Sequence, residues 1–238
     1  MAIDKRTHKI ERKLEDGVFD ANTFAVIHKL MKQGHLDKLG GPIAVGKEAN
    51  VYRAYLGETN LAVKIYRLET SSFHKMMPYI QGDPRFDVKQ AKYNIVQTWA
   101  KKEFQNLKRA AKANVPCPQP IAVLKNVLVM SFIGNEHPAP ELRNYAPVDM
   151  PAVYAGTIDA LKKLYTGGEL VHGDMSEFNI LIHNEAPVLI DFGQGVLKSH
   201  MRAEELMNRD CEVLARFFRK KGIETSDSEI KKAITSAI

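Results

Sequence analysis

Three polar side chains in the second half of the chain have the types and the spacing that phosphoryl transfer requires. Asp174, Asn179 and Asp191 stand in the stretch VHGDMSEFNILIHNEAPVLIDFGQG. Two short apolar runs beside them, 179–182 and 187–190, predict a loop that leads into a β-hairpin. One carboxylate in such a layout can orient a hydroxyl or a water, while an amide and a second carboxylate hold magnesium on a nucleotide's phosphates. The pattern therefore predicts a site for nucleotide-dependent phosphoryl transfer.

The preceding elements supply a candidate cation and a candidate partner for it. Lys64 lies in the apolar run LAVKI on a predicted strand, from which a lysine can reach phosphates; an outward-facing lysine is the alternative. A helix is predicted over 88–113, where Glu103 falls between Trp99 and Leu107 on the apolar face. A carboxylate facing a core is costly unless it is paired, so Glu103 is predicted to pair with Lys64. A solvated position at the rim of the helix face is the alternative.

Two segments flank the predicted lysine strand. The β-rich sequence from Pro42 onwards predicts a hairpin joined at 57–60, and its glycine-bearing turn at 46–50 could fold over phosphates. That turn has one glycine, so an ordinary turn at a sheet edge is the alternative. The segment 68–87 contains two prolines and a glycine without a sustained period, which predicts a long loop, mobile over the nucleotide site.

The remaining chain predicts a hinge strand and several helices. The run 121–133 reads as two strands around a turn at Asn126, and its end is where a hinge would meet adenine, with Met130 either behind the pocket or in the sheet core. A helix is predicted over 149–168, and helices resume after Gly195. The predicted first helix ends near Gly34 as its C-cap, and Ser226 and Glu229 form a capping box.

Composition sets broad limits. The chain has 238 residues, of which 45% are hydrophobic and 26% charged, which is typical of a globular protein without an apolar run long enough to span a bilayer. The charged N-terminus lacks the apolar core of a secretory signal, and two cysteines, Cys117 and Cys211, make no disulfide framework, so a cytoplasmic location is expected. The net charge of +6 is spread along the chain, which fits RNA, a ribosomal particle or phosphate ligands.

The order of these motifs resembles that of protein kinases: glycine-bearing loop, strand lysine, helix glutamate, hinge, H-x-D-x-x-x-x-N and D-F-G. His172-Gly173-Asp174 departs from the usual His-Arg-Asp, and the same HGD also occurs in small-molecule kinases such as aminoglycoside phosphotransferases. The finer resemblance, over 41–218, is to the first subfamily of the RIO atypical protein kinases, in a minimal, archaeal-type form. It rests on GKEANVY, VKIY, WAKKE, VLVMSFIG, VHGDMSEFN and the insert at 68–87.

This resemblance implies an α+β, bilobal protein-kinase-like fold. A helical accessory segment (1–40) precedes a β-rich N-lobe (41–134) with its flexible insert, and a mainly helical C-lobe (135–238) follows. Because 47 residues follow Asp191 and helical patterning resumes soon after Gly195, we expect no long activation segment and no peptide-docking subdomain.

The resemblance also implies roles for individual residues. Asp174, Lys64 and Asp191 are expected to be catalytic, with Asn179 and Asp191 as metal ligands and Asp191 also as a phosphate acceptor. His172 and Asp210 are expected to shape and brace the catalytic loop. ATP contacts are expected from Gly46, Lys47, Glu48, Val51, Lys64, Glu103, Met130 and the backbone of Ser131 and Ile133.

The expected function is that of a monomeric, autophosphorylating serine kinase and ATPase that uses ATP with Mg²⁺, or with Mn²⁺, in maturation of the small ribosomal subunit. Its expected partners are the proteins and the rRNA of the pre-ribosomal particle, with no membrane partner. Two alternatives remain open at this point: a small-molecule kinase, and a nonenzymatic assembly factor that binds ATP as a conformational ligand.

Overall fold

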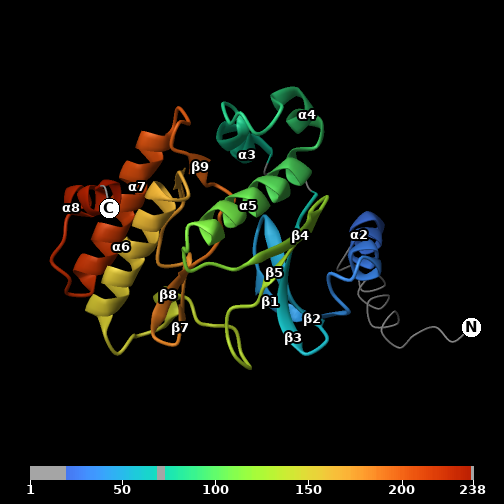
Figure 1. Ribbon diagram of the computed structural model, residues 1–238, viewed down its shortest axis with the longest axis horizontal. Coiled ribbons are helices and arrows are strands. Elements are labelled where there is room, and N and C mark those ends of the chain that lie inside the picture. Colours follow the sequence, from blue (N-terminus) through green and yellow to red (C-terminus); the bar gives the residue numbers. More distant parts are fainter. Residues whose placement is uncertain (1–19, 69–72, 237–238) are drawn as a thin grey trace, which may run out of the picture.

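The computed structural model describes residues 20–68 and 73–236, so the expected helical content of 1–19 lies outside the described residues. Figure 1 shows a sheet beside a group of helices, with α5 running between the two. The helices are α2 (Ala21–Lys32), α3 (Phe73–Ile80), α4 (Val88–Tyr93), α5 (Ile95–Lys112), the 3-10 turn η2 (Leu142–Asn144), α6 (Met150–Thr166), α7 (Ala203–Lys220) and α8 (Asp227–Thr235). The strands are β1 (Lys38–Val45), β2 (Ala49–Leu56), β3 (Thr59–Tyr66), β4 (Pro120–Leu124), β5 (Val127–Ser131), β6 (Leu170–Val171), β7 (Ile180–His183), β8 (Ala186–Leu189) and β9 (Val196–Leu197).

The five-stranded antiparallel sheet, in the order β1-β2-β3-β5-β4, fixes the direction of the candidate lysine. Side chains alternate between the two faces of a strand. On β3, Leu61, Val63 and Ile65 therefore enter the core that the sheet forms with α2, while Lys64 points to the opposite face. The predicted hairpin turns at 57–60 and at Asn126 are both confirmed by this sheet.

The helix predicted over 88–113 is divided by Asn94, which has non-helical dihedrals (φ −132°, ψ 43°). The prediction of one continuous helix was therefore wrong. Ala91 on α4 and Ile95 on α5 are both buried in one cluster with Trp99, so tertiary packing overrides the continuous helical pattern. The C-terminal part, α5, carries the candidate glutamate.

The insert contains a helix where the sequence predicted only a loop. In α3, Met76 and Ile80 stand one turn apart and are fully buried against α5, and the ring of Tyr79 meets that of Trp99 edge-on at 5.8 Å. Pro78, a reason for predicting a loop, lies inside this short helix. The buried face stabilises the helix, and such packing has no local sequence signal. The predicted mobility of the insert stays a prediction.

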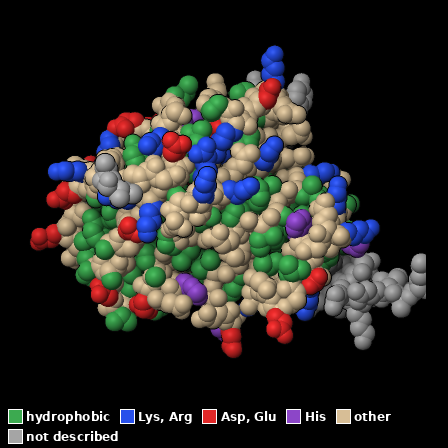
Figure 2. Space-filling model, viewed as in Figure 1, with side chains coloured by type: hydrophobic (Ala, Val, Ile, Leu, Met, Phe, Trp, Pro, Cys, Tyr) green, Lys and Arg blue, Asp and Glu red, His purple; other side chains and the backbone are tan. Residues whose placement is uncertain are grey.

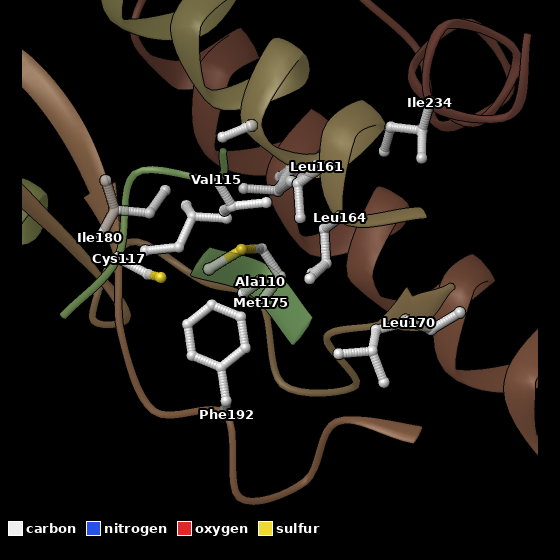
Figure 3. Close-up of a cluster of buried hydrophobic side chains, with 14 of the residues drawn as sticks. Ala110, Val115, Cys117, Leu161, Leu164, Leu170, Met175, Ile180, Phe192 and Ile234 are labelled. Carbon is white, nitrogen blue, oxygen red and sulfur yellow. The ribbon is translucent and has the colours of Figure 1, made fainter. Parts of the chain in front are cut away.

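The helices α6, α7 and α8 pack around one cluster of buried hydrophobic side chains, part of which is drawn in Figure 3. Phe192 from the D-F-G sequence is fully buried there beside Met175 and Leu164, so the loop that bears Asp191 is anchored in the core. The predicted helix at 149–168 is confirmed as α6, whose first turn is capped by Asp149 through the Ala152 N–H.

The helix α6 buries one side in this cluster. The fully buried side of α6 is centred on Val153, Thr157, Ala160, Leu161 and Leu164, while Tyr154, Ile158 and Tyr165 are only partly buried. The capping box of α8 is present as predicted. Within the described residues, no helix is long and apolar enough to cross a membrane.

Candidate active site

Lys64 bridges two carboxylates at the junction of the sheet and the helical part. Its Nζ lies 2.9 Å from Glu103 on α5 and 2.9 Å from Oδ1 of Asp191. Lys64 is 7% exposed and Glu103 1% exposed, whereas the side chain of Asp191 is 46% exposed. The predicted pairing of Lys64 with Glu103 is present, and the alternatives of an outward lysine and a solvated glutamate are not. The arrangement holds Lys64 beside the carboxylate that faces the open side of the site.

The charges of this group are set by burial and by one another. Burial alone would lower the pKa of Lys64, but the carboxylates of Asp191 and Glu103 outweigh it and raise that pKa, so Lys64 stays protonated. Partial burial raises the pKa of Asp191, yet Lys64 at 2.9 Å outweighs it and holds that pKa below its ordinary value. Asp191 is therefore an anion at neutral pH, as a metal ligand or a nucleophile must be.

Asp174 and Asn179 face each other across the catalytic loop. The Asn179 amide donates to the Asp174 backbone carbonyl over 2.7 Å, which leaves the Asn179 side-chain oxygen available as a ligand. Burial, with Asp191 nearby, raises the pKa of Asp174 to about 6, although Arg209 and Asn179 oppose the shift. A carboxylate with a pKa near neutrality is suited to accepting a proton from an attacking hydroxyl.

Asp210 braces the catalytic loop from below, as the sequence predicted. Its two carboxylate oxygens accept the N–H groups of Gly173 (2.7 Å) and Met175 (2.9 Å), so the backbone on both sides of Asp174 is fixed. Arg209 donates to the Gly173 carbonyl. Gly173 has φ +77°, and a Cβ there would lie 2.9 Å from the Gln194 carbonyl oxygen. This close approach explains why glycine replaces the arginine of the usual His-Arg-Asp motif.

His172 shapes the same loop from the core, as expected. Its Nε2 lies 3.0 Å from the Ile190 carbonyl and its ring packs on Phe192 with the centroids 5.0 Å apart. Burial lowers the pKa of His172 to about 4. The residue is therefore neutral at physiological pH and links the catalytic loop to the residue before Asp191.

The predicted phosphate loop is the turn between β1 and β2. The Gly46 N–H donates to the Ala49 carbonyl over 3.0 Å, and a Cβ on Gly46 would lie 2.9 Å from that oxygen, so the tight turn favours glycine. Lys47 and Glu48 lie in this turn and Val51 follows on β2. The charge of Glu48 is among the causes that raise the pKa of Asp174 on the catalytic loop.

The expected hinge residues stand at the end of β5 and just beyond it. The Ser131 N–H already donates to the Gln119 carbonyl (2.8 Å), and the Ile133 carbonyl accepts the Ala139 N–H (3.0 Å). The Ser131 carbonyl and the Ile133 N–H are therefore the hinge groups through which contacts to adenine stay expected. Met130 is half-buried and packs against the core of the helical part. This position does not decide between a place behind the adenine pocket and a place in the sheet core.

A pocket of about 300 Å³ lies between the phosphate loop, the insert and the segment after Asp191. Its lining residues come from all three regions and from α5: Glu48, Lys75, Met76, Pro78, Tyr79, Trp99, Gln194 and Arg202. Figure 2 shows most of the visible basic side chains in the upper half of this face, several of them close together near its centre.

The sequence reading missed a layer of polar residues beneath the site. Lys102 and Asn106 on α5 are fully buried and donate to backbone carbonyls of the segment after Asp191. The sequence contained one signal for Lys102: it stands next to Glu103 on the side of the helix that is buried.

The donor set fits a hard cation held together with a nucleotide. In the described part of the chain, no cluster of three or more His, Cys, Asp or Glu side chains could hold a metal by itself. Asn179 and Asp191 offer oxygen atoms, the ligands that Mg²⁺ prefers, and Mg²⁺ commonly takes one or two protein ligands together with phosphates and water. The residues present therefore fit magnesium bound jointly with ATP.

The chain has the fold and the site of a protein-kinase-like phosphotransferase. A five-stranded lobe and a helical lobe meet at a junction that holds a lysine, a glutamate and an aspartate. The family described as the RIO domain matches residues 50–231. The chain belongs to the RIO family of atypical serine/threonine protein kinases, within its Rio1 subfamily. The predicted family and fold class are thereby confirmed.

The chain is similar to several known proteins in sequence or in structure. The RIO-type serine/threonine-protein kinase Rio1 of Haloferax volcanii is 43% identical over 226 residues, covering 94% of this chain and 78% of that protein. The Rio2 kinase of Chaetomium thermophilum, solved as an ADP/Mg²⁺-phosphoaspartate complex, has a TM-score of 0.68 at 27% identity over 90% of this chain and 67% of its own. The structure of a streptomycin-ATP-APH(2")-IIa complex shares the fold alone, with a TM-score of 0.52 at 12% identity, over 91% of this chain and 86% of its own.

Proposed function

We propose that this kinase transfers the γ-phosphoryl group of ATP, with Mg²⁺ held by Asn179 and Asp191. Lys64 neutralises charge on the phosphates from the buried platform of β3, and Asp174 orients the attacking oxygen and accepts its proton. The observation that carries the proposal is the bridge formed by Lys64, 2.9 Å from Glu103 and 2.9 Å from Asp191. That bridge joins the two lobes at the point where the phosphates would lie.

The nucleotide would lie between the phosphate loop and the hinge. In this proposal Gly46, Lys47, Glu48 and Val51 cover the phosphates, and Met130 lies behind the adenine. The carbonyl of Ser131 and the N–H of Ile133 then bind the adenine edge, since the Ser131 N–H and the Ile133 carbonyl already have partners within the protein.

Asp191 is also proposed as an acceptor of phosphate. Its carboxylate attacks the γ-phosphorus, the bond to the bridging oxygen of ADP breaks, and ADP leaves. Water then hydrolyses the acyl phosphate, releasing inorganic phosphate and regenerating the carboxylate. The side chain of Asp191 is 46% exposed and its pKa is held low by Lys64, which suits a nucleophile. The phosphoaspartate in the Chaetomium thermophilum Rio2 complex supports this step.

The proposed activities are therefore autophosphorylation on serine and ATP hydrolysis, and the proposed setting is maturation of the small ribosomal subunit by a cytoplasmic monomer. Membership of the Rio1 subfamily supports a protein acceptor over a small-molecule one. The net charge of +6 is compatible with contact to an RNA-containing particle.

One set of variants tests these roles. Asp174→Ala is expected to abolish autophosphorylation while ATP still binds, and Asp191→Asn is expected to remove both turnover and trapping of an acid-stable, hydroxylamine-sensitive phosphoenzyme. Glu212→Gln, an exposed substitution on α7, serves as control. Full turnover in Asp174→Ala would overturn the assignment. Co-sedimentation with small ribosomal subunit precursors, with and without ATP, tests the proposed setting, and no ATP-dependent association would contradict it.

A further inference from the structure

The segment that follows Asp191 is laid against α5 by hydrogen bonds from two buried side chains. Lys102 donates to the Gly193 carbonyl over 2.9 Å and also to the Gly195 carbonyl. Asn106 donates to the carbonyls of Phe192 and Gly195, each over 2.8 Å. The backbone carbonyls after Asp191 thus point into the protein, toward fixed donors.

Close packing reinforces this attachment. A Cβ on Gly193 would lie 2.9 Å from the Trp99 indole, and one on Gly195 would lie 3.0 Å from the Asn106 amide. The backbone therefore approaches α5 more closely than a side chain would allow. Asp191 itself has φ +61°, a left-handed conformation that is uncommon for aspartate and must be held by its surroundings.

Two residues of the insert complete the arrangement. Arg85 donates from Nη1 to the Asn106 side-chain oxygen over 2.9 Å, which fixes the amide so that its N–H groups face the loop carbonyls. Asp83 holds the Arg85 guanidinium at both ends, with Nε to Oδ1 at 2.9 Å and Nη2 to Oδ2 at 2.6 Å. The chain of contacts therefore runs from the insert through α5 to the segment that bears Asp191.

The charges of this group depend on one another. The buried Lys102 ammonium contacts neutral carbonyls, and it lies over the face of Trp99, 5.4 Å from the ring centroid. Burial, with Arg85 nearby, lowers the pKa of Lys102 to about 7, and Asp83 opposes the shift. Burial raises the pKa of Asp83, but Arg85 and then Lys102 outweigh it and lower that pKa. Asp83 thus pairs directly with Arg85 and attracts Lys102 from farther away, and the insert supplies it.

We infer that Asp83, Arg85, Lys102 and Asn106, here called the Asp83 cluster, are positioning residues that set the orientation of Asp191 for metal binding. The inference rests on the proposed role of Asp191 as a magnesium ligand. It gives the insert a second role besides its position next to the nucleotide site. Local order of 83–85 and affinity for the metal are then coupled, because the same hydrogen bonds serve both.

The test compares metal dependence with metal-free nucleotide binding. Arg85→Lys keeps the positive charge but loses the two-ended contact with Asp83 and the contact with Asn106. Asn106→Leu keeps the volume and removes the donor. Each is expected to raise the free Mg²⁺ concentration for half-maximal ATP turnover by about tenfold, the lower end of the effect of residues that orient metal ligands. Binding of ADP in EDTA is expected to change less than about twofold, since no phosphate or adenine contact is altered.

Controls separate this inference from the proposed function. Arg109→Lys, also on α5, alters an arginine that bonds the Gly168 carbonyl and is expected to leave the Mg²⁺ requirement unchanged. Asp191→Asn must itself disrupt Mg²⁺-dependent turnover; if it does not, the metal-ligand assignment fails. If Asp191→Asn does so while Arg85→Lys and Asn106→Leu keep the wild-type Mg²⁺ requirement, the Asp83 cluster has no positioning role. If Asn106→Leu does not fold, Arg85→Lys decides, and equal losses in Mg²⁺ dependence and metal-free binding overturn the inference.

Discussion

Removing the charge of Glu103 should change the Mg²⁺ requirement of the kinase without a large change in its free energy of unfolding. In Glu103→Gln the amide can still accept a hydrogen bond from Lys64, but the negative charge 2.9 Å from Nζ is lost. Lys64 is then attracted mainly to Asp191, so this cation competes with magnesium for the Asp191 carboxylate. A hydrogen bond to a charged group contributes roughly 1.5–3 kcal/mol, and part of it remains with glutamine. We therefore expect a shift of about 1.4 kcal/mol, or roughly tenfold, in the Mg²⁺ requirement.

The free energy of unfolding of Glu103→Gln should change much less than its Mg²⁺ requirement. Burial raises the pKa of Glu103 to about 7 despite the attraction of Lys64, so its buried charge carries a large desolvation cost. Removing that charge offsets the loss of the ion pair, and the free energy of unfolding is expected to change by less than about 1 kcal/mol. Lys64→Met instead leaves two carboxylates without their cation and is expected to cost about 3–5 kcal/mol.

The assays are ATP turnover against free Mg²⁺ and chemical denaturation at pH 7.5. Glu212→Gln, an exposed and otherwise identical change, is the control and should match the wild type in both. The reasoning is refuted if Glu103→Gln destabilises the protein as much as Lys64→Met. It is equally refuted if Glu103→Gln keeps the wild-type Mg²⁺ requirement.

Three further predictions concern the catalytic loop. Because the pKa of Asp174 is raised to about 6 and the carboxylate form is needed, kcat/KM is expected to fall as pH drops below that value; initial rates that stay flat from pH 8 to 5 would contradict this. Burial lowers the pKa of His172 to about 4 in the folded protein, against 6.5 in the unfolded chain. The contribution of neutral His172 to the free energy of unfolding is therefore fully present above pH 6.5 and is lost as the pH falls toward 4, by at most about 3 kcal/mol. Denaturation of His172→Asn across this range should show a shallower acid decline, and an unchanged decline would argue against it. Gly173→Ala is expected to cost about 1–3 kcal/mol and most of the turnover, since φ is +77° and the new Cβ would meet the Gln194 carbonyl; full activity at wild-type thermal stability would contradict it.

The residues of the candidate site could be found from the sequence because each has a local signal. The helical spacing of Glu103 placed its carboxylate on an apolar face, where it needed a cation, and Lys64 on the neighbouring strand was the candidate; the structure puts the two groups 2.9 Å apart. Asp174, Asn179 and Asp191 lie within one loop and hairpin, so their proximity follows from short-range turns. The strands and the caps of the C-terminal helices were predictable for the same reason.

Other features depend on contacts between distant segments and had no such signal. The short helix α3 exists because Met76 and Ile80 are buried against α5, while its proline and polar residues suggest a loop. The break at Asn94 likewise follows from packing on both sides of it. The Asp83 cluster joins the insert, α5 and the segment after Asp191, and no periodicity in any one of them indicates the other two.

One face of α5 carries Trp99, Lys102, Glu103 and Asn106. Because these residues have fixed partners, the helix tolerates insertions and deletions less well than it tolerates substitutions elsewhere on its surface. These four residues lie within eight consecutive positions, about two helical turns, and contact the insert, the segment after Asp191 and the strand lysine. Adding or deleting one residue before Trp99 would rotate all four by about 100° and shift them by about 1.5 Å, so none could keep its partner. Evolutionary drift in this kinase should therefore substitute residues on the outer face of α5 freely, while insertions and deletions accumulate in the loops before and after it.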